Sequence, residues 1–125
     1  MRVRFRYTGI RVRDLERSLA FYTGLLGMRV IAEGTMPHGG RYVHLRTPGS
    51  QQRLELNWYP ESSRFYTAYR AGEEMDHLAF VVDDVRRAYR ELTRKGVDVA
   101  VSPADSKDTE VYLKDPDGIW IELLQ

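Results

Sequence analysis

Two stretches of the chain, Tyr7-Thr-Gly-Ile-Arg-Val-Arg-Asp14 and His77-Leu-Ala-Phe-Val-Val-Asp-Asp84, share one pattern: a ring side chain, a segment of strand composition and a closing aspartate. Tyr7 and His77 lie 70 residues apart, and so do Asp14 and Asp84. The composition of the segment predicts a strand, and an aspartate before an amphipathic segment is typical of a helix N-cap. The sequence therefore predicts two copies of one module, each of which begins with a strand and a helix.

The two copies also end alike. Thr47-Pro48-Gly49 precedes Leu54-Glu55-Leu56, and Asp115-Pro116-Asp117-Gly118 precedes Ile121-Glu122-Leu123. The offset is 68 residues at the prolines and 67 at the glutamates, so the copies differ by small loop changes. Each copy thus offers one side chain from its first strand and one carboxylate from its last, and these can converge on one ion.

The composition limits the classes of function. The chain has 125 residues, no Cys and a net charge of +1, so disulfides, thiolate metal sites and Cys nucleophiles are excluded. Basic and acidic side chains are interleaved, which argues against a nucleic-acid partner. No apolar run approaches the roughly 18 residues that cross a bilayer, and no signal-peptide pattern is present. We expect a cytoplasmic protein with a small-molecule substrate and no membrane partner.

The predicted elements follow the same order in both copies. Module one (1–59) should contain strands at 3–12, 28–34, 40–47 and 51–59 and a helix from Asp14 to Gly27. A linker (60–75) with one helical turn should follow. Module two (76–125) should contain strands at 76–82, 97–102, 109–114 and 118–124 and a helix from Asp84 to Gly96. The expected fold class is α+β, with two tandem βαβββ modules that form a curved mixed sheet around a metal or ligand cleft.

The period-2 alternation of strands assigns side chains to the two faces of the sheet. Leu54, Leu56, Ile121 and Leu123 are apolar and should lie under the helices. The opposite face, toward the cleft, should then carry Tyr7, Arg11, Glu55, Asn57, His77 and Glu122.

Glu55, His77 and Glu122 form a mixed nitrogen and oxygen ligand set. Such a set suits Zn(II), Ni(II), Co(II), Mn(II) or Fe(II), and it leaves positions for substrate oxygens. Taken alone, each glutamate is more simply a solvated side chain and His77 a hydrogen-bonded structural residue. The correspondence between the two copies favours a metal site, at which a carboxylate could also move a proton.

The remaining polar residues of the predicted cleft leave alternatives open. Tyr7 could ligate the ion, donate a hydrogen bond to a bound oxygen or fill the cleft, and we favour donation because phenol is a poor ligand near neutral pH. Arg11 could receive a substrate carboxylate or form a surface salt bridge. His38 and His44 have no matched partner in the other copy, and we expect both to be structural or exposed.

The sequence resembles the vicinal oxygen chelate superfamily, which includes glyoxalase I, bleomycin-resistance proteins and extradiol dioxygenases. The resemblance spans the chain and is most specific at three segments: Val12-Arg-Asp-Leu-Glu-Arg-Ser-Leu-Ala-Phe-Tyr22, Leu26-Gly-Met28 and Asp115-Pro-Asp-Gly-Ile-Trp-Ile-Glu-Leu123. Within the superfamily, the chain is most similar to bacterial glyoxalase I. That family isomerises the hemithioacetal of methylglyoxal and glutathione with Ni(II) or Zn(II).

The resemblance implies roles for individual residues. In glyoxalase I the ion is held by His, Glu, His and Glu, and the last three positions are matched by Glu55, His77 and Glu122. Tyr7 stands where the family has its first histidine. Glu122 matches the family's catalytic base, and Arg11 matches the arginine that binds the glutathione carboxylate. Asn57 matches the family's asparagine, although the Glu-Leu-Asn-Trp segment is two residues shorter than the usual spacing in the family. The resemblance also implies a divalent metal ion, glutathione as a candidate co-substrate, and a homodimer.

The sequence thus favours an enzyme, a metal-dependent lyase or isomerase that transfers a proton through an enediolate of a small substrate with vicinal oxygens. The first alternative is a non-catalytic protein of the bleomycin-resistance type that sequesters a ligand. The second is a relative of the ring-cleaving dioxygenases, which use two His and one Glu. A single usable His in the predicted cleft makes that alternative weaker.

Overall fold

The computed structural model describes residues 2, 6–37, 39–63, 65–73, 75, 77–106 and 109–125. His38 and the expected strand residues 3–5 lie outside these described residues. The chain divides into two compact units, Met1–Tyr69 (unit 1) and Arg70–Gln125 (unit 2), and each is described by itself.

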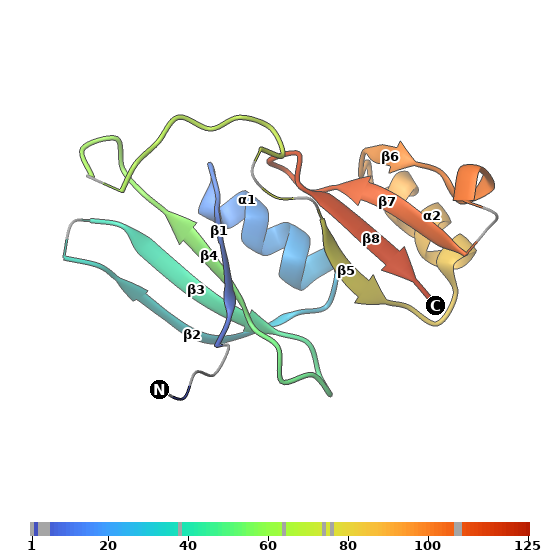
Figure 1. The fold of residues 1–125 in the computed structure, drawn as a ribbon, viewed down its shortest axis with the longest axis horizontal. Helices are drawn as coiled ribbons and strands as arrows, with labels where there is room; N and C mark the ends of the chain where they lie inside the picture. The colour runs from blue at the N-terminus through green and yellow to red at the C-terminus, as the bar shows by residue number, and fades with distance from the viewer. Residues whose placement is uncertain are drawn as a thin grey trace. The chain divides into compact units, whose positions relative to one another are not determined.

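Unit 1 is a four-stranded mixed sheet with helical structure on one face (Figure 1). Its elements are β1 (Thr8–Arg11), α1 (Leu15–Leu19), the π-helical η1 (Ala20–Leu25), β2 (Arg29–Thr35), β3 (Arg41–Arg46) and β4 (Leu54–Trp58). The strand order is β1-β4-β3-β2. β1 pairs in parallel with β4, and the other pairings are antiparallel.

Unit 2 repeats this topology. Its elements are β5 (Leu78–Val81), α2 (Val85–Arg94), β6 (Val99–Val101), the 3-10 turn η2 (Pro103–Ser106), β7 (Glu110–Lys114) and β8 (Trp120–Leu124). The strand order is β5-β8-β7-β6, again with the first and last strands parallel. The predicted α+β class and the two tandem βαβββ modules are confirmed, and the expected curved mixed sheet is seen as two four-stranded sheets.

Two details differ from the sequence prediction. The described residues of segment 60–75 form turns and no helix, so the predicted helical turn is wrong. The first helix is not regular to its end, because the Leu26 N–H donates to the carbonyl of Phe21, five residues back, at 3.2 Å. This π-helical turn buries both Phe21 and Tyr22, whereas the 3.6-residue period selects only Tyr22 for the core.

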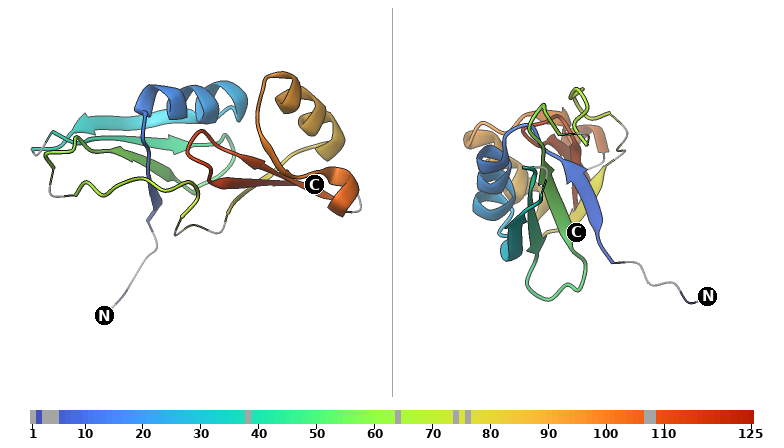
Figure 2. Two further views of the ribbon diagram at one scale, coloured as in Figure 1. Left: turned by 90° about the horizontal axis from the view of Figure 1, so that it is seen from above. Right: turned by 90° about the vertical axis from the view of Figure 1, so that its left-hand side faces the viewer.

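In each unit the helix packs on the face that carries the apolar strand residues (Figure 2). Leu54, Leu56, Ile121 and Leu123 are all buried, as the alternation predicted. The buried residues of unit 1 also include Val12, Tyr22, Val43 and Leu45, and those of unit 2 include Val85, Val111 and Leu113. Since each such side chain contributes about 1.5–3 kcal/mol on burial, these faces fix the registers of the strands.

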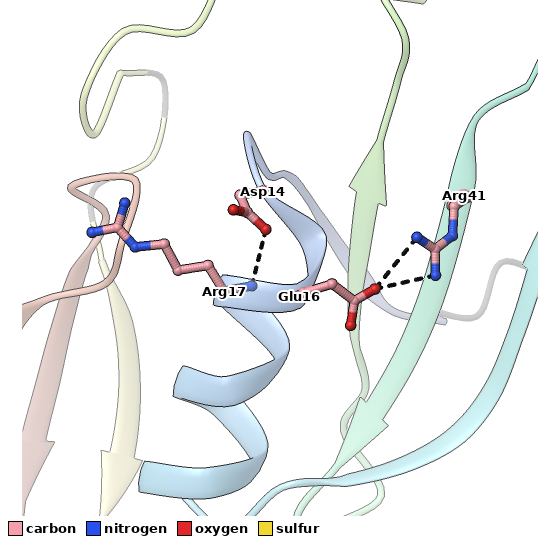
Figure 3. A network of polar contacts seen from close by, with 4 residues as sticks. All are labelled: Asp14, Glu16, Arg17 and Arg41. Carbon is pink, nitrogen blue, oxygen red and sulfur yellow. Dashed lines mark hydrogen bonds and ion pairs between the residues drawn. The ribbon is translucent and has the colours of Figure 1, made fainter.

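The helix starts are fixed by the two predicted caps. The Asp14 carboxylate accepts a hydrogen bond from the Arg17 backbone N–H at 3.1 Å, and Asp84 does the same for Arg87 at 2.9 Å. Figure 3 shows the first cap beside the exposed ion pair of Glu16 with Arg41, which links α1 to β3 at 3.4 Å.

Replacing either capping aspartate with alanine should lower the free energy of unfolding by about 1 kcal/mol, because one helical N–H loses its partner. Asp83→Ala is a matched control, since Asp83 precedes the second cap and is exposed. Urea unfolding of D14A, D84A and D83A measures the effect. Equal stability of D84A and D83A would contradict the cap assignment.

Candidate metal and substrate site

On the face of unit 1 that the helix leaves uncovered, β4 presents Glu55 and Asn57, which alternate with the buried leucines. The Asn57 side-chain amide donates to Glu55 Oε1 at 2.8 Å, and Asn57 is itself buried. As predicted, the two residues lie on one face of the sheet. The hydrogen bond between them holds one carboxylate oxygen of Glu55 in place.

The other carboxylate oxygen of Glu55 is engaged by a residue that the sequence analysis set aside. His44 on β3 lies directly opposite Glu55 in the register of the sheet. Its Nε2 lies 2.6 Å from Glu55 Oε2, and the two side chains are only 12% and 14% exposed. His44 is therefore a partly buried partner of a candidate metal ligand, and the alternative that it is exposed is wrong.

Tyr7 packs its ring against the His44 ring, with centroids 4.8 Å apart in an edge arrangement. Nearby, burial raises the pKa of Tyr59, and the negative charge of Glu55 raises it further while Arg11 lowers it. The Tyr59 hydroxyl near Glu55 therefore keeps its proton at neutral pH and can donate a hydrogen bond.

Arg11 is held within unit 1 by contacts other than the salt bridge that was one expected alternative. Its guanidinium donates to the Thr67 carbonyl at 3.1 Å and lies 5.5 Å from the centre of the Tyr69 ring. The Tyr69 hydroxyl in turn donates to the Val12 carbonyl at 2.6 Å. These contacts orient Arg11 and leave further N–H donors of its guanidinium for an anionic group.

Unit 2 carries the second pair of predicted ligands. His77 Nε2 lies 3.2 Å from Glu122 Oε2, and the Tyr112 hydroxyl donates to Glu122 Oε1 at 3.0 Å. Tyr112 also packs its ring edge-on against His77, with centroids 5.7 Å apart. The structure therefore brings His77 and Glu122 together, with Tyr112 orienting the carboxylate.

A second carboxyl group lies next to Glu122. Loss of solvent raises the pKa of Glu110, and so do its hydrogen bond with Glu122 and the charge of that carboxylate, whereas His77 lowers it. The carboxyl groups of Glu110 and Glu122 therefore interact directly, and Glu110 holds its proton more firmly than an isolated glutamate would. Neither Glu110 nor Tyr112 was predicted for the site, because both lie on β7, a strand for which the sequence analysis proposed no functional residue.

The sequence does contain a signal for His44 and Tyr112. They lie 68 residues apart, the same offset as Pro48 and Pro116, and in the structure each faces the glutamate of its own unit. Comparing all ring side chains at this offset would have found the pair.

Each unit thus supplies one close His–Glu pair, His44–Glu55 or His77–Glu122. Over the described part of the chain, no cluster of three or more His, Asp or Glu side chains that could hold an ion is found. Imidazole nitrogen and carboxylate oxygen are nevertheless the donors that suit Zn(II), Ni(II) and related ions. In the same residues, no helix is long and apolar enough to span a membrane.

Comparison with known proteins identifies relatives along the whole chain. Residues 4–123 match the model of the Glyoxalase/Bleomycin resistance protein/Dioxygenase superfamily. The lactoylglutathione lyase of Salmonella typhimurium is 31% identical over 98% of this chain and 93% of the relative. That of Neisseria meningitidis serogroup A is 32% identical over 98% of this chain and 91% of the relative.

Solved structures give the same result. The trypanothione-dependent glyoxalase I of Leishmania major has a TM-score of 0.83 and 32% identity, covering 99% of this chain and 87% of that one. An antibiotic binding protein from Streptomyces sp. CB03234 has a TM-score of 0.74 and 25% identity, covering 98% and 95%. The relatives named as lyases support the prediction of an enzyme. With the family model matching nearly end to end, the chain belongs to the glyoxalase, bleomycin-resistance and dioxygenase superfamily.

Proposed function

We propose that this protein is a metal-dependent lyase of the glyoxalase I type, which isomerises the hemithioacetal of a small 2-oxoaldehyde and a thiol such as glutathione. The observation that carries the proposal is the pairing of His77 with Glu122 at 3.2 Å, with Tyr112 bound to the second carboxylate oxygen. The lactoylglutathione lyases that share about 31% of its residues support the same activity.

The proposed ligands of the ion are Glu55, His77 and Glu122. Their donor types fit Zn(II), Ni(II), Co(II), Mn(II) or Fe(II), and no thiolate is available to narrow the choice. When bound, such an ion acts as a Lewis acid on the two neighbouring oxygens of the substrate. The hydrogen bond from Asn57 to Glu55 and that from Tyr112 to Glu122 would orient the two carboxylates for this task.

Glu122 is the proposed proton carrier. Its carboxylate takes the proton from the substrate carbon that bears the sulfur, which leaves an enediolate, and it returns the proton to the adjacent carbon. The substrate's hydroxyl proton then moves to the neighbouring oxygen, so the hydroxyl and carbonyl groups exchange places and no atoms are gained or lost. Glu110 lies beside the Glu122 carboxylate, and the hydrogen bond between the two carboxyl groups raises the pKa of Glu110 along with desolvation.

Arg11 is the proposed contact for a carboxylate of the thiol. Arg11→Ala should raise KM for the thiol adduct by about 10–100-fold and change kcat little, since a charge-assisted contact remote from the reacting carbons is lost. Arg13→Ala is the matched control, because the Arg13 guanidinium lies over the same Tyr69 ring, at 5.7 Å. Steady-state kinetics of both variants give the comparison, and a shared rise in KM would contradict a specific role of Arg11.

The test of the proposed function has two parts. Protein purified without chelators is analysed for bound metal, and the isomerisation of methylglyoxal adducts of glutathione and of trypanothione is measured. About one divalent ion per chain, and turnover that is lost with a chelator and restored by the ion, are expected. Absence of both bound metal and turnover would overturn the proposal.

The alternative of a non-catalytic binding protein is favoured by two observations. The antibiotic binding protein from Streptomyces has a TM-score of 0.74 with this chain, and Tyr7 stands where glyoxalase I has a histidine. Saturable binding of a small ligand by metal-free protein, without turnover, would support this alternative. The expected homodimer remains a prediction in either case.

A further inference from the structure

We propose that His44 is a metal ligand that takes the place of the missing first-strand histidine, so that unit 1 binds the ion through His44 and Glu55. This inference rests on the proposed metal-dependent function, and it adds a ligand on a different strand from the one that the family resemblance implies.

Two side chains are exchanged between the strands of the two units. In unit 2, His77 directly precedes β5, and β7 places Tyr112 opposite Glu122. In unit 1 the order is reversed: Tyr7 precedes the first strand, and the third strand places His44 opposite Glu55. At these two equivalent positions each unit therefore has an imidazole and a phenol, and the positions of the two rings are exchanged between the units.

The distances between the donor atoms of the two pairs are also informative. His44 Nε2 and Glu55 Oε2 lie 2.6 Å apart, and the corresponding atoms of His77 and Glu122 lie 3.2 Å apart. Donors that share an ion at about 2.1 Å are roughly 3.0–3.4 Å from each other. The pair in unit 2 has this spacing, and the pair in unit 1 would reach it if side-chain movements separated its two atoms by a further ~0.4–0.8 Å.

Within the part of the chain that the structure describes, the His44 ring has a polar contact only with Glu55. Its Nδ1 is buried and has no hydrogen-bond partner among the described residues. A histidine kept for structural reasons usually satisfies both ring nitrogens when it is buried. Here the polar contact of the ring is to the Glu55 carboxylate, and the rings of Tyr7 and Tyr42 fix its plane from the sides.

A competing role for His44 is that it only orients Glu55, as Tyr112 orients Glu122. The two roles differ in what a second histidine can repair. If His44 is a ligand, a histidine placed at position 7 should restore the lost nitrogen donor, because this position is equivalent to that of His77. If His44 only orients Glu55, a histidine at position 7 should not repair the loss.

Competition with a chromophoric chelator measures the Zn(II) dissociation constant of each variant. His44→Leu should weaken binding at least about 100-fold, because even indirect partners of a metal ligand contribute 10–100-fold. The double variant Tyr7→His/His44→Leu should bind within about tenfold of the wild type. Arg41→Gln is the control, because Arg41 lies on the same strand but pairs with the exposed Glu16 on α1, and this variant should bind like the wild type. Thermal melts of the metal-free variants report whether each is folded.

A second measurement needs no substitution. The chain has three histidines, so the imidazole ¹⁵N resonances of the wild type are readily assigned. Saturation with Zn(II) should shift the ring nitrogens of both His44 and His77, and a shift confined to His77 would overturn the inference.

The outcomes separate the inference from the function on which it rests. If wild type and His44→Leu bind Zn(II) equally, His44 is not a ligand and the proposed function stands. If His44→Leu binds Zn(II) weakly and the double variant Tyr7→His/His44→Leu binds equally weakly, the ligand role of His44 is also overturned. If the wild type binds no divalent ion, the proposed function fails, and the inference fails with it.

Discussion

Replacing Glu122 with glutamine should lower kcat by about 10²–10⁴-fold, the range that a positioned general base contributes. Glutamine has the shape of glutamate, and its amide oxygen can still accept the hydrogen bond from Tyr112 that is seen at 3.0 Å. It cannot take up a proton from carbon. The rate should therefore fall even when the variant is saturated with metal, and initial rates at saturating ion and adduct measure the effect.

Glu91→Gln is the matched control for this change. Glu91 lies on α2, exposed and paired with Lys95 at 3.1 Å, which lowers the pKa of its carboxyl group. The control removes one carboxylate charge from the same unit and should leave kcat unchanged. Undiminished turnover of Glu122→Gln with a full complement of metal would remove Glu122 as the base.

Truncating a central leucine in either unit should cost about 2–5 kcal/mol in the free energy of unfolding. Leu56 on β4 is 0% exposed and Leu123 on β8 is 1% exposed, and both occupy the helix-covered face. Leu56→Ala and Leu123→Ala each remove a side chain that neighbours cannot replace, so a cavity remains. Urea unfolding followed by circular dichroism measures both variants.

Val81→Ala supplies the comparison for these truncations. Val81 is an apolar strand residue that is 79% exposed, so its truncation should change stability by no more than about 0.5 kcal/mol. A loss for Leu56→Ala as small as that for Val81→Ala would mean that the helix-covered face of unit 1 is not a packed core.

Residues whose positions are set by local patterns were predicted well from the sequence. Asp14 and Asp84 cap their helices, and Leu54, Leu56, Ile121 and Leu123 are buried. These results follow from short-range rules, because capping acts within one turn and the alternation of a strand has a period of two. Because the two units repeat at an offset of about 70 residues, a prediction made for one unit also applied to the equivalent residues of the other.

Features that depend on several strands, or on a departure from regular geometry, were missed. The alternation could place His44 on a face, but it could not say that His44 lies opposite Glu55, since that depends on the register of two strands. The same holds for Tyr112 and Glu110 beside Glu122. The π-helical turn at Ala20–Leu25 was missed because a fixed helical period cannot represent an extra residue in one turn.

The pairing of the first and last strands within each unit has a consequence for biosynthesis. All four strands of unit 1 lie between Thr8 and Trp58, and β1 is joined directly to β4. A nascent chain can therefore complete this sheet while the ribosome is still translating the residues of unit 2, in line with the tendency of compact units to fold in order of synthesis. Once the first sheet is finished, β3 and β4 are paired on both sides, so the emerging strands of the second half can no longer pair with them.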